Sequence, residues 1–411
     1  MNQLSVNEVV AALRLAPEVA TVLERNWTRS ITELPDELPG FLRQEVIRDS
    51  FSGSGIPAEV LPDLEQMARE IAADPYRLAL AWHGYRCLTV YDSPHFAAWP
   101  ELDARFYLLL ALSIVPLLFE RYRERGLPEE AAAACIAYYG NNYNALLKNT
   151  GRSGWDRRTL HWVRHYIDLN CFQIGRLQYM LTWARAYNTV VFRHRRSGQI
   201  LAGSGPEFRR FNAEGLVCFP DETAVIAGTG IETPANAEVI PFDPHGFALP
   251  NPVRLDFSEW EMVVSPSDRV LGVHIPTGGQ MTLEKCEDSF RHAVQFFKTY
   301  FPEIDNKAFF SSSWIFSPYY EKALPDSNLA RFMRELYLCP CSSSGTDGVL
   351  FIFGREDANY QDYPGDNSIR RAMLKVLNGG GRLRSGGMFF LLEHLDRFGT
   401  QCYRRQPPDF N

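Results

Sequence analysis

Apolar residues recur at a helical spacing through the first 170 positions of the chain. The segments with this period are 7–15, 57–74, 101–126, 128–149 and 159–177. Helix punctuation accompanies the pattern, because Gly126 closes one segment and Pro128 opens the next with two glutamates behind it. We therefore predict an all-helical domain over residues 1–170.

From about Arg176 the apolar pattern changes to short runs rich in β-branched and aromatic residues. These runs are TVVFRHRRSGQILAG at 189–203, GLVCF at 215–219, EWEMVV at 259–264 and RVLGVHI at 269–275. Gly, Pro and Asp separate the runs, which is typical of a mostly antiparallel sheet. Residues 265–268 join the last two runs, so we predict that these two strands form a hairpin.

Helices return between the later strands. One predicted helix has a single apolar face made by Leu283, Cys286, Phe290, Ala293, Val294 and Phe297. Further helices are predicted over 326–338, 366–378 and 388–398, and further strands over 307–316 and 348–354. The second domain, residues 171–411, is thus predicted to be α+β, with a mixed, mostly antiparallel sheet, flanking helices and a helical extension at its C-terminus.

Charge and cysteine content narrow the class of protein. A net charge of −7 and a pI near 5.8 provide no overall field for nucleic acid. The apolar run 107–119 is too short to cross a bilayer, and the N-terminus lacks a basic segment followed by an apolar block. The eight cysteines are scattered, so we expect no disulfide framework and a location in the reducing cytoplasm.

The segment 271–297 reads as a strand that turns through glycines into a helix. Such a turn exposes the first N–H groups of the helix, with the positive end of the helix dipole behind them, and favours a bound phosphate. The alternative is an ordinary helix start, with Thr282 as N-cap and Glu284 in the first turn. The local sequence leaves both interpretations open.

The order of predicted elements from the proposed hairpin onward resembles the C-terminal part of the GCN5-related N-acetyltransferase (GNAT) fold. The whole chain resembles bacterial acyltransferase-domain proteins with a helical N-terminal domain and a GNAT-like C-terminal domain. The residues that carry the likeness are LGVHIPTGGQMTLEKCEDSF at 271–290, SSWIFSP at 312–318 and LPDSNLARFM at 324–333.

The resemblance implies a site for acyl-coenzyme A (acyl-CoA), with acetyl-CoA as the expected donor. In the GNAT fold the pantetheine arm pairs with the strand before the turn, and the pyrophosphate lies on the following helix N-terminus. The residues that this assigns to the cofactor are Val273, Ile275, Thr277, Gly278, Gly279 and Gln280. The resemblance also assigns Asn328 to the opening of the next helix and Tyr337 to the proton donor for the leaving thiolate.

Transfer to an amine also requires a base, because the amine must lose a proton. Glu259 and Glu261 alternate on one predicted strand and His274 lies on its predicted neighbour, so we expect Glu261 or His274 to act as the base. The alternative is that the glutamates lie on a hydrated sheet face and His274 is a core histidine with its hydrogen bonds satisfied. Tyr337 could equally be a core residue.

The remaining motifs add little chemistry. His161 and His165 lack an acidic third ligand, and we predict no metal site. The glycine-rich segment 379–387 contains Arg382 and Arg384, and it either helps to bind nucleotide phosphates or forms a loop between two helices.

The sequence thus predicts an N-acyltransferase that passes an acyl group directly from acyl-CoA to an amine of a small molecule or peptide. The acceptor is expected to enter between the helical domain and the sheet. The alternative is a binding or regulatory protein that keeps the GNAT-like fold without the chemistry. The sequence leaves the oligomeric state open.

Overall fold

The computed structural model of the protein describes residues 4–91, 96–204, 210–227 and 233–405. The chain divides into two compact units, Met1–Gln173 and Ile174–Asn411. We describe each unit by itself.

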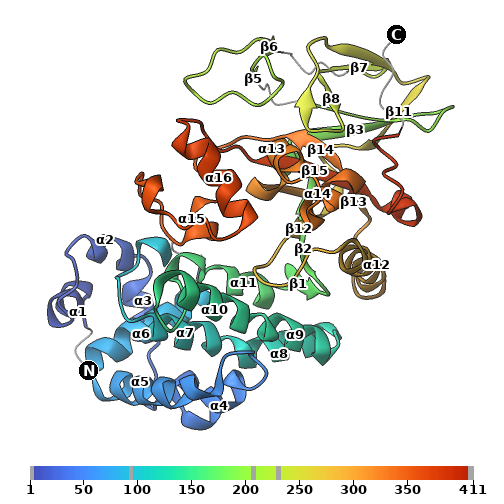
Figure 1. The fold of residues 1–411 in the computed structure, drawn as a ribbon. Coiled ribbons are helices and arrows are strands. Elements are labelled where there is room, and N and C mark those ends of the chain that lie inside the picture. Colours follow the sequence, from blue (N-terminus) through green and yellow to red (C-terminus); the bar gives the residue numbers. More distant parts are fainter. Residues whose placement is uncertain (1–3, 92–95, 205–209, 228–232, 406–411) are drawn as a thin grey trace. The chain divides into compact units, whose positions relative to one another are not determined.

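The first unit is built from helices (Figure 1). Its α-helices are α1 (Val6–Ala12), α2 (Val19–Leu23), α3 (Trp27–Thr32), α4 (Gln44–Phe51), α5 (Leu61–Ala73), α6 (Pro75–Thr89), α7 (Ala104–Ser113), α8 (Val115–Arg125), α9 (Glu129–Ala137), α10 (Tyr139–Thr150) and α11 (Trp162–Ile167). Short 3₁₀ turns accompany them at η1 (Gly40–Leu42), η2 (Ala58–Val60), η3 (Phe96–Ala98) and η4 (Arg157–Thr159). The predicted helical N-terminal region is confirmed.

The most apolar stretch of the chain forms two helices. The break falls at Ile114, which is followed by Val115 and Pro116 at the start of α8, because proline cannot donate an interior helix hydrogen bond. Every residue of α7 except Arg105 is buried, so this helix belongs to the core of its unit. Within the described residues, no helix is both long and apolar enough to cross a membrane.

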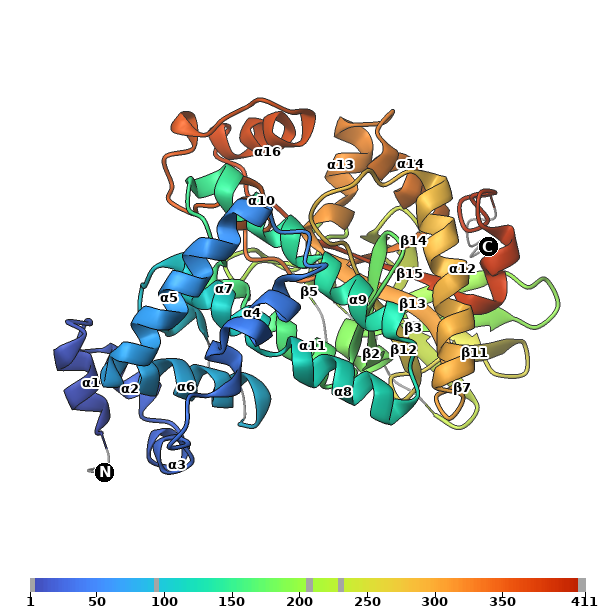
Figure 2. The ribbon, with the colours of Figure 1, turned by 90° about the horizontal axis from the view of Figure 1, so that it is seen from below.

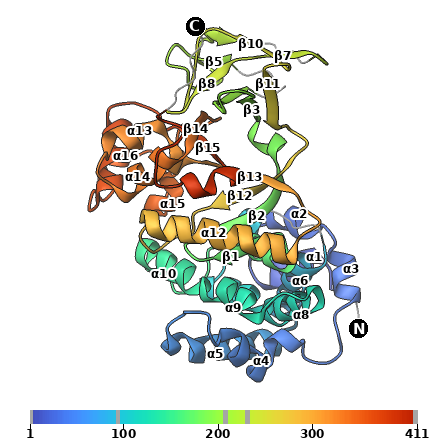
Figure 3. The same ribbon diagram turned by 90° about the vertical axis from the view of Figure 1, so that its right-hand side faces the viewer.

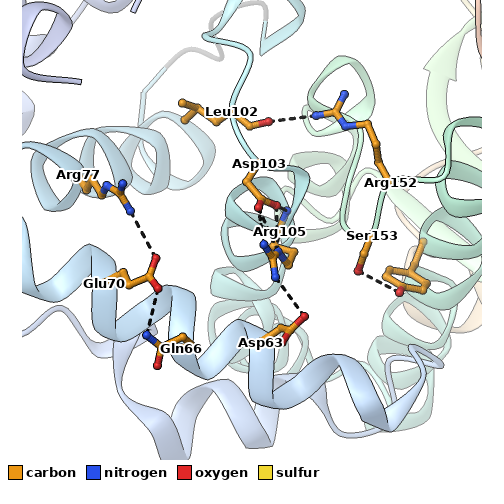
Figure 4. Close-up of polar contacts among 10 residues, drawn as sticks. Asp63, Gln66, Glu70, Arg77, Leu102, Asp103, Arg105, Arg152 and Ser153 are labelled. Carbon is orange, nitrogen blue, oxygen red and sulfur yellow. Dashed lines mark hydrogen bonds and ion pairs between the residues drawn. The ribbon is translucent and has the colours of Figure 1, made fainter. Parts of the chain in front are cut away.

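Polar contacts on the surface of the helical unit connect α5 with the start of α7 (Figure 4). Asp103 caps α7 by accepting from the Arg105 amide at 2.9 Å, and its carboxylate pairs with the Arg105 guanidinium at 2.6 Å. The same guanidinium reaches Asp63 on α5 at 3.1 Å. The hydrogen bond from the Arg105 side chain is the main cause that lowers the pKa of Asp103. These contacts fix the entry to α7, and nothing in their geometry indicates a ligand.

The second unit contains the strands. They are β1 (Cys171–Ile174, which spans the division), β2 (Leu177–Trp183), β3 (Thr189–His194), β4 (Ile200–Ser204), β5 (Arg210–Phe211), β6 (Ile226–Ala227), β7 (Asn236–Val239), β8 (Pro241–Asp243), β9 (Phe247–Ala248), β10 (Val253–Asp256), β11 (Trp260–Val264), β12 (Arg269–His274), β13 (Asn306–Ser313), β14 (Tyr337–Pro340) and β15 (Gly386–Leu391). Among the described residues, the main sheet has the order β1-β2-β12-β13-β15-β14, and a second sheet has the order β11-β3-β4-β8-β9.

Helices and 3₁₀ turns fill the remainder of the second unit. They are η5 (Ala184–Tyr187), α12 (Leu283–Tyr300), η6 (Trp314–Phe316), α13 (Pro318–Ala323), α14 (Asn328–Glu335), α15 (Val349–Phe353), η7 (Tyr360–Asp362), α16 (Ser368–Asn378) and η8 (Leu392–Arg397). The predicted combination of a mixed, mostly antiparallel sheet with flanking helices is confirmed.

The predicted hairpin across residues 265–268 is wrong. β12 pairs with β2 in the main sheet, whereas β11 pairs with β3 in the second sheet. Residues 265–268 instead run beside η5, where the Ala184 amide donates to the Asp268 carbonyl at 3.0 Å. One chain segment runs from β2 through η5 to β3, and the other runs from β11 through residues 265–268 to β12. Together they form one long antiparallel ribbon that leaves the main sheet and enters the second one (Figure 3).

Helix α12 lies along the main sheet (Figure 2). The predicted apolar face is confirmed, since Cys286, Phe290, Ala293 and Phe297 are buried. The Phe290 ring stacks on Phe309 of β13 with centroids 4.1 Å apart. This packing fixes the helix whose N-terminus follows the glycine turn.

Three other local predictions are wrong. Residues 171–177 are not helical, because α11 ends at Ile167 and strands follow. Residues 348–354 form the short helix α15 rather than a strand, and residues 388–398 form β15 and η8 rather than a helix. In each case an apolar run of few residues fits both periods, and long-range packing decides between them.

Candidate active site

The strands β12 and β13 separate at the end that faces the glycine turn. They run parallel, and their register ends at Gly272 opposite Phe310. Both strands continue beyond this pair. β12 extends to His274 and stays paired with β2, and β13 extends to Ser313 and stays paired with β15. We call residues 272–274 and 310–313 the strand fork.

The strand fork provides backbone edges that the β12–β13 ladder does not use. An extended ligand that carries amide groups can pair with such an edge in the same way as an added strand. Val273 is buried and opposite Tyr179 of β2, and Ile275 is half-buried just beyond the strand. These two residues therefore lie on the segment that leads from the fork to the turn.

The turn itself is exposed and has a left-handed backbone at two positions. Gly278 has φ 81° and Gly279 has φ 68°, a region that side chains with a Cβ rarely occupy. Residues 277–280 are exposed, so Thr277, the two glycines and Gln280 present their surfaces to solvent. An anion can approach the backbone here.

Thr282 caps the helix that follows. Its side chain accepts from the Lys285 amide at 3.4 Å, as the capping interpretation predicted. Hydrogen bonds to its own backbone amide and to Thr282 lower the pKa of Glu284. Part of the first turn of α12 is thus satisfied internally, and the exposed N–H groups for an anion are those of the glycine turn before it.

Arg176 is a cationic residue beside the turn that the sequence did not reveal. Its guanidinium donates to the Pro276 carbonyl at 3.1 Å and to the Gly279 carbonyl at 3.4 Å. Ser289 on α12 fixes the neighbouring backbone, because its hydroxyl accepts from the Leu177 amide at 3.3 Å. The residue comes from the β1–β2 turn, about a hundred positions away in sequence, so no local pattern could have linked it to the glycines.

His274 lies at the tip of β12. It is half-buried and opposite Gln178 of β2. Residues two apart on a strand point to the same face, so His274 shares its face with Gly272. An imidazole at this position borders the strand fork.

Glu261 does not lie beside His274. It belongs to β11 in the second sheet, and its carboxylate accepts from the Arg193 guanidinium at 3.2 Å. The same guanidinium contacts both oxygens of Glu393 at 2.7 Å. Because the expected hairpin is absent and the carboxylate is ion-paired, the geometry does not favour Glu261 as the base. Glu259 is likewise on the second sheet's side of the ribbon and pairs with Arg196 at 3.4 Å.

Tyr337 does not lie on a helix. Helix α14 ends at Glu335, and Tyr337 begins the buried strand β14. Its hydroxyl donates to the Phe242 carbonyl at 2.5 Å and accepts from the Ala202 amide at 3.4 Å. Both partners are backbone groups of the second sheet, so the structure contradicts a proton-donor role and supports the core interpretation.

Asn328 is the first residue of α14, as expected, but Ser327 is the N-cap and accepts from the Ala330 amide at 3.0 Å. The side chain of Asn328 is half-buried. Its contact with a ligand stays a prediction.

A tyrosine that the sequence analysis missed lies against the strand fork. The Tyr187 ring stacks on Phe310 with centroids 5.1 Å apart. A Cβ added at Gly272 would come within 2.6 Å of the Tyr187 hydroxyl oxygen. Tyr187 ends the 3₁₀ turn η5, and its approach to β12 depends on the long ribbon, which periodicity does not reveal.

The glycine-rich segment 379–387 has no free cationic face for phosphate. The Arg382 and Arg384 guanidinium carbons lie 3.9 Å and 4.2 Å from the centroid of the Phe219 ring. Arg382 also pairs with Asp221 at 2.6 Å. The segment is a connection, but it leads from α16 into β15 and not into a second helix as the loop interpretation expected.

The cysteine nearest the turn in sequence is unsuited to carry an acyl group. Cys286 is fully buried on α12, and burial raises the pKa of its thiol to about 12. A protonated, inaccessible thiol is a poor nucleophile. Across the described residues, no group of three His, Cys, Asp or Glu side chains is arranged to hold a metal ion.

A mixed sheet with splayed parallel strands, a glycine turn and a capped helix defines the GNAT-like class of acyltransferase folds. Residues 171–390 match the family described as the GNAT-like C-terminal domain, and residues 46–169 match the N-acyltransferase N-terminal domain. The chain belongs to this family of GNAT-like acyltransferases, and the predicted resemblance is confirmed.

Solved structures share the same fold over nearly the whole chain. One is an acyltransferase in complex with decanoyl-CoA and teicoplanin, with 18% identity, a TM-score of 0.63, and coverage of 95% of this chain and 100% of the other. Another is a mutant of the acyltransferase orf11* in complex with octanoyl-CoA, with 18% identity, a TM-score of 0.62, and coverage of 94% and 99%. At this identity the likeness establishes the fold alone. A search of curated proteins finds no match.

Proposed function

We propose that the protein transfers an acyl group directly from acyl-CoA to an amine of a small molecule or peptide. The observation that carries the proposal is the strand fork, whose parallel register ends at Gly272 while both strands continue. The pantetheine amides would pair with Val273 and Ile275, and the phosphates would lie on residues 277–280. Family membership supports this donor.

In the proposed reaction His274 accepts a proton from the amine. The amine nitrogen then attacks the thioester carbonyl carbon, a C–N bond forms, and the C–S bond breaks with its electron pair passing to sulfur. The CoA thiolate takes up a proton from solvent. The burial of Cys286 supports direct transfer rather than an acyl-enzyme at that thiol.

The acyl group and the acceptor are finer parts of the proposal. The sequence suggested acetyl, but relatives of this fold were crystallised with octanoyl-CoA and decanoyl-CoA, so we extend the proposal to acyl chains of up to ten carbons. The complex of one relative with teicoplanin supports including this compound among the acceptors to be tested.

The first experiment is a thermal-stability series with CoA, acetyl-CoA, octanoyl-CoA and decanoyl-CoA, and with adenosine diphosphate as a nucleotide that lacks the pantetheine arm. A ligand at about a hundred times its Kd stabilises the native state by about 2.7 kcal/mol. We expect a shift with the acyl-CoA series that exceeds the shift with the nucleotide. No shift with any acyl-CoA at millimolar concentration would refute the proposal.

Turnover separates an enzyme from a binding protein that keeps the fold. The release of CoA thiol is followed with octanoyl-CoA and a panel of amines that includes teicoplanin and short peptides. The ion pairing of Glu261 and the burial of the Tyr337 hydroxyl favour the binding protein as the second candidate. Binding without turnover on any member of the panel would support that candidate.

A further inference from the structure

We propose that the Tyr187 hydroxyl donates a hydrogen bond to the sulfur of the bound thioester and stabilises the thiolate as it leaves. This inference rests on the proposed function and adds a catalytic residue to it. Two observations on the second unit and the direction of the proposed ligand support it.

The first observation is the position of the hydroxyl. It lies against Gly272, the last residue of β12 in register with β13, and the ring is held by stacking on Phe310, the partner of Gly272 in that register. Tyr187 thus covers the apex of the strand fork from the face that Gly272 shares with His274.

The second point is the direction that a ligand placed by the proposed function would take. With phosphates on residues 277–280 and a pantetheine arm extended along β12, the arm runs back toward Gly272 and covers roughly 20 Å over six residues. The thioester at the end of the arm therefore arrives at the apex. The phenol on the sheet face then lies beside the sulfur.

The third point is the state of the phenol. Its hydroxyl makes no hydrogen bond to any residue that the structure describes, and the side chain is half-buried. Burial raises the pKa of Tyr187, so the phenol keeps its proton. A proton that is held firmly is shared with sulfur in a hydrogen bond and is not transferred, because a thiolate is a weaker base than the tyrosinate. The bond grows stronger as negative charge develops on sulfur.

The test does not depend on the acceptor. Free CoA thiol is titrated on the protein by the ultraviolet absorbance of its thiolate, in the wild type and in Tyr187→Phe, which keeps the ring that stacks on Phe310. We expect the hydroxyl to lower the pKa of the bound thiol, so that the phenylalanine variant raises it by about one unit, a tenfold change in the ionisation constant. His274, Tyr337 and Cys339 are titratable side chains on the same face of the sheet, so a titration of the protein without CoA is subtracted from the titration with CoA.

The matched control is Tyr319→Phe on α13, which removes a tyrosine hydroxyl that donates to the Ala372 carbonyl of α16 at 3.2 Å. It should leave the titration of bound CoA unchanged. Octanoyl-CoA should bind to Tyr187→Phe within about threefold of the wild type, while the rate of CoA release with an amine falls about tenfold or more.

A double-variant cycle tests the geometry. Gly272→Ala introduces a methyl group that must displace the Tyr187 hydroxyl, so it should raise the pKa of the bound thiol in the wild-type background and have little effect in the Tyr187→Phe background. An unchanged thiol pKa in Tyr187→Phe, with CoA still bound, would overturn the role of Tyr187 and leave the proposed function intact. A wild type that binds no CoA would overturn both.

Discussion

His274 is the residue that the proposed reaction uses as its base, so its removal separates chemistry from binding. We expect His274→Gln to lower kcat by about 10² to 10⁴ while the thermal shift with octanoyl-CoA is retained. A base acts when deprotonated, so wild-type kcat/KM should fall when the pH is low enough to protonate the imidazole, and the variant should lose this acid limb. Steady-state rates measured over a range of pH, for the wild type and for His274→Gln, check the fall in kcat and the loss of the acid limb.

The control for this variant is His292→Gln on α12. That imidazole is exposed and lies 3.2 Å from Asp288, away from the fork residues of β12. It should leave the rate and the pH profile unchanged. If His274→Gln keeps the wild-type rate, another group is the base.

A second prediction at the scale of one residue concerns Arg176 and the affinity for CoA. Its guanidinium is held beside the glycine turn, where it would contact a bound phosphate. We expect Arg176→Gln to weaken CoA binding about tenfold or more, because charge-assisted hydrogen bonds are the stronger ones, and Arg176→Lys to recover part of the affinity. Calorimetric titration with CoA at two salt concentrations checks this.

The matched control for Arg176 is Arg371→Gln, which removes an exposed guanidinium on α16 that donates to the Gly365 carbonyl at 3.0 Å. Equal losses in both variants would indicate a general charge effect and would contradict a phosphate contact at Arg176.

Tyr337 illustrates why single residues were assigned less well than elements. The helical spacing of Phe332, Met333 and Leu336 extends to Tyr337 in the sequence, yet the helix stops at Glu335. Tyr337 is extended because β14 pairs with β15, some fifty positions further along the chain. The same limit hid Tyr187 and Arg176, since their neighbours are distant in sequence. His274 could be proposed from the sequence because it lies on the strand that leads into the glycine turn.

At the scale of elements, a buried carboxylate holds the segment that follows η8. Glu335 at the end of α14 is 2% exposed and accepts from the Gly399 amide at 2.8 Å and from the Gln401 amide at 2.9 Å. We expect Glu335→Ala to destabilise the protein by about 2 to 3 kcal/mol, because it removes two hydrogen bonds from backbone amides to a buried carboxylate. Glu335→Gln keeps one carbonyl oxygen and should cost less. Urea unfolding of both variants measures the difference, and equal values would contradict the explanation.

Elements with a strong local signal were predictable from the sequence. Helix α12 has a cap, a full apolar stripe and eighteen residues, so its period is unambiguous. The short segments 265–268 and 348–354 lack such redundancy. A tight connection between two strand-like runs looks like a hairpin whether the strands pair with each other or with other partners, and only the position of β2 and β3 distinguishes the two cases.

At the scale of the whole molecule, one histidine makes the stability of the helical unit depend on pH. His83 is 1% exposed and stacks on Trp99 with centroids 5.7 Å apart. Burial lowers the pKa of His83 to about 4. The unfolded chain takes up this proton near its usual pKa of about 6.5, so stability is lost as pH falls from about 6.5 to 4, by up to about 3 kcal/mol.

We expect His83→Phe, which keeps an aromatic ring at this position, to remove most of this dependence. Unfolding followed by circular dichroism between pH 4 and pH 7 measures it, and His245→Gln, at an exposed side chain of the second unit, is the control. A slope that persists in His83→Phe would assign the dependence to other groups.

The long ribbon of the second unit has a consequence for how such a protein can be altered. Residues 189–264, which include β3 and β11, leave the main sheet at η5 and return at residues 265–268, where the Arg185 amide donates to the Pro266 carbonyl at 3.1 Å. The two ends of this segment are therefore adjacent, as are the two ends of an inserted domain. The segment can be exchanged as a cassette, provided that the replacement supplies partners for β14. Grafting it between relatives would replace the second sheet while β12 keeps its register with β2 and β13.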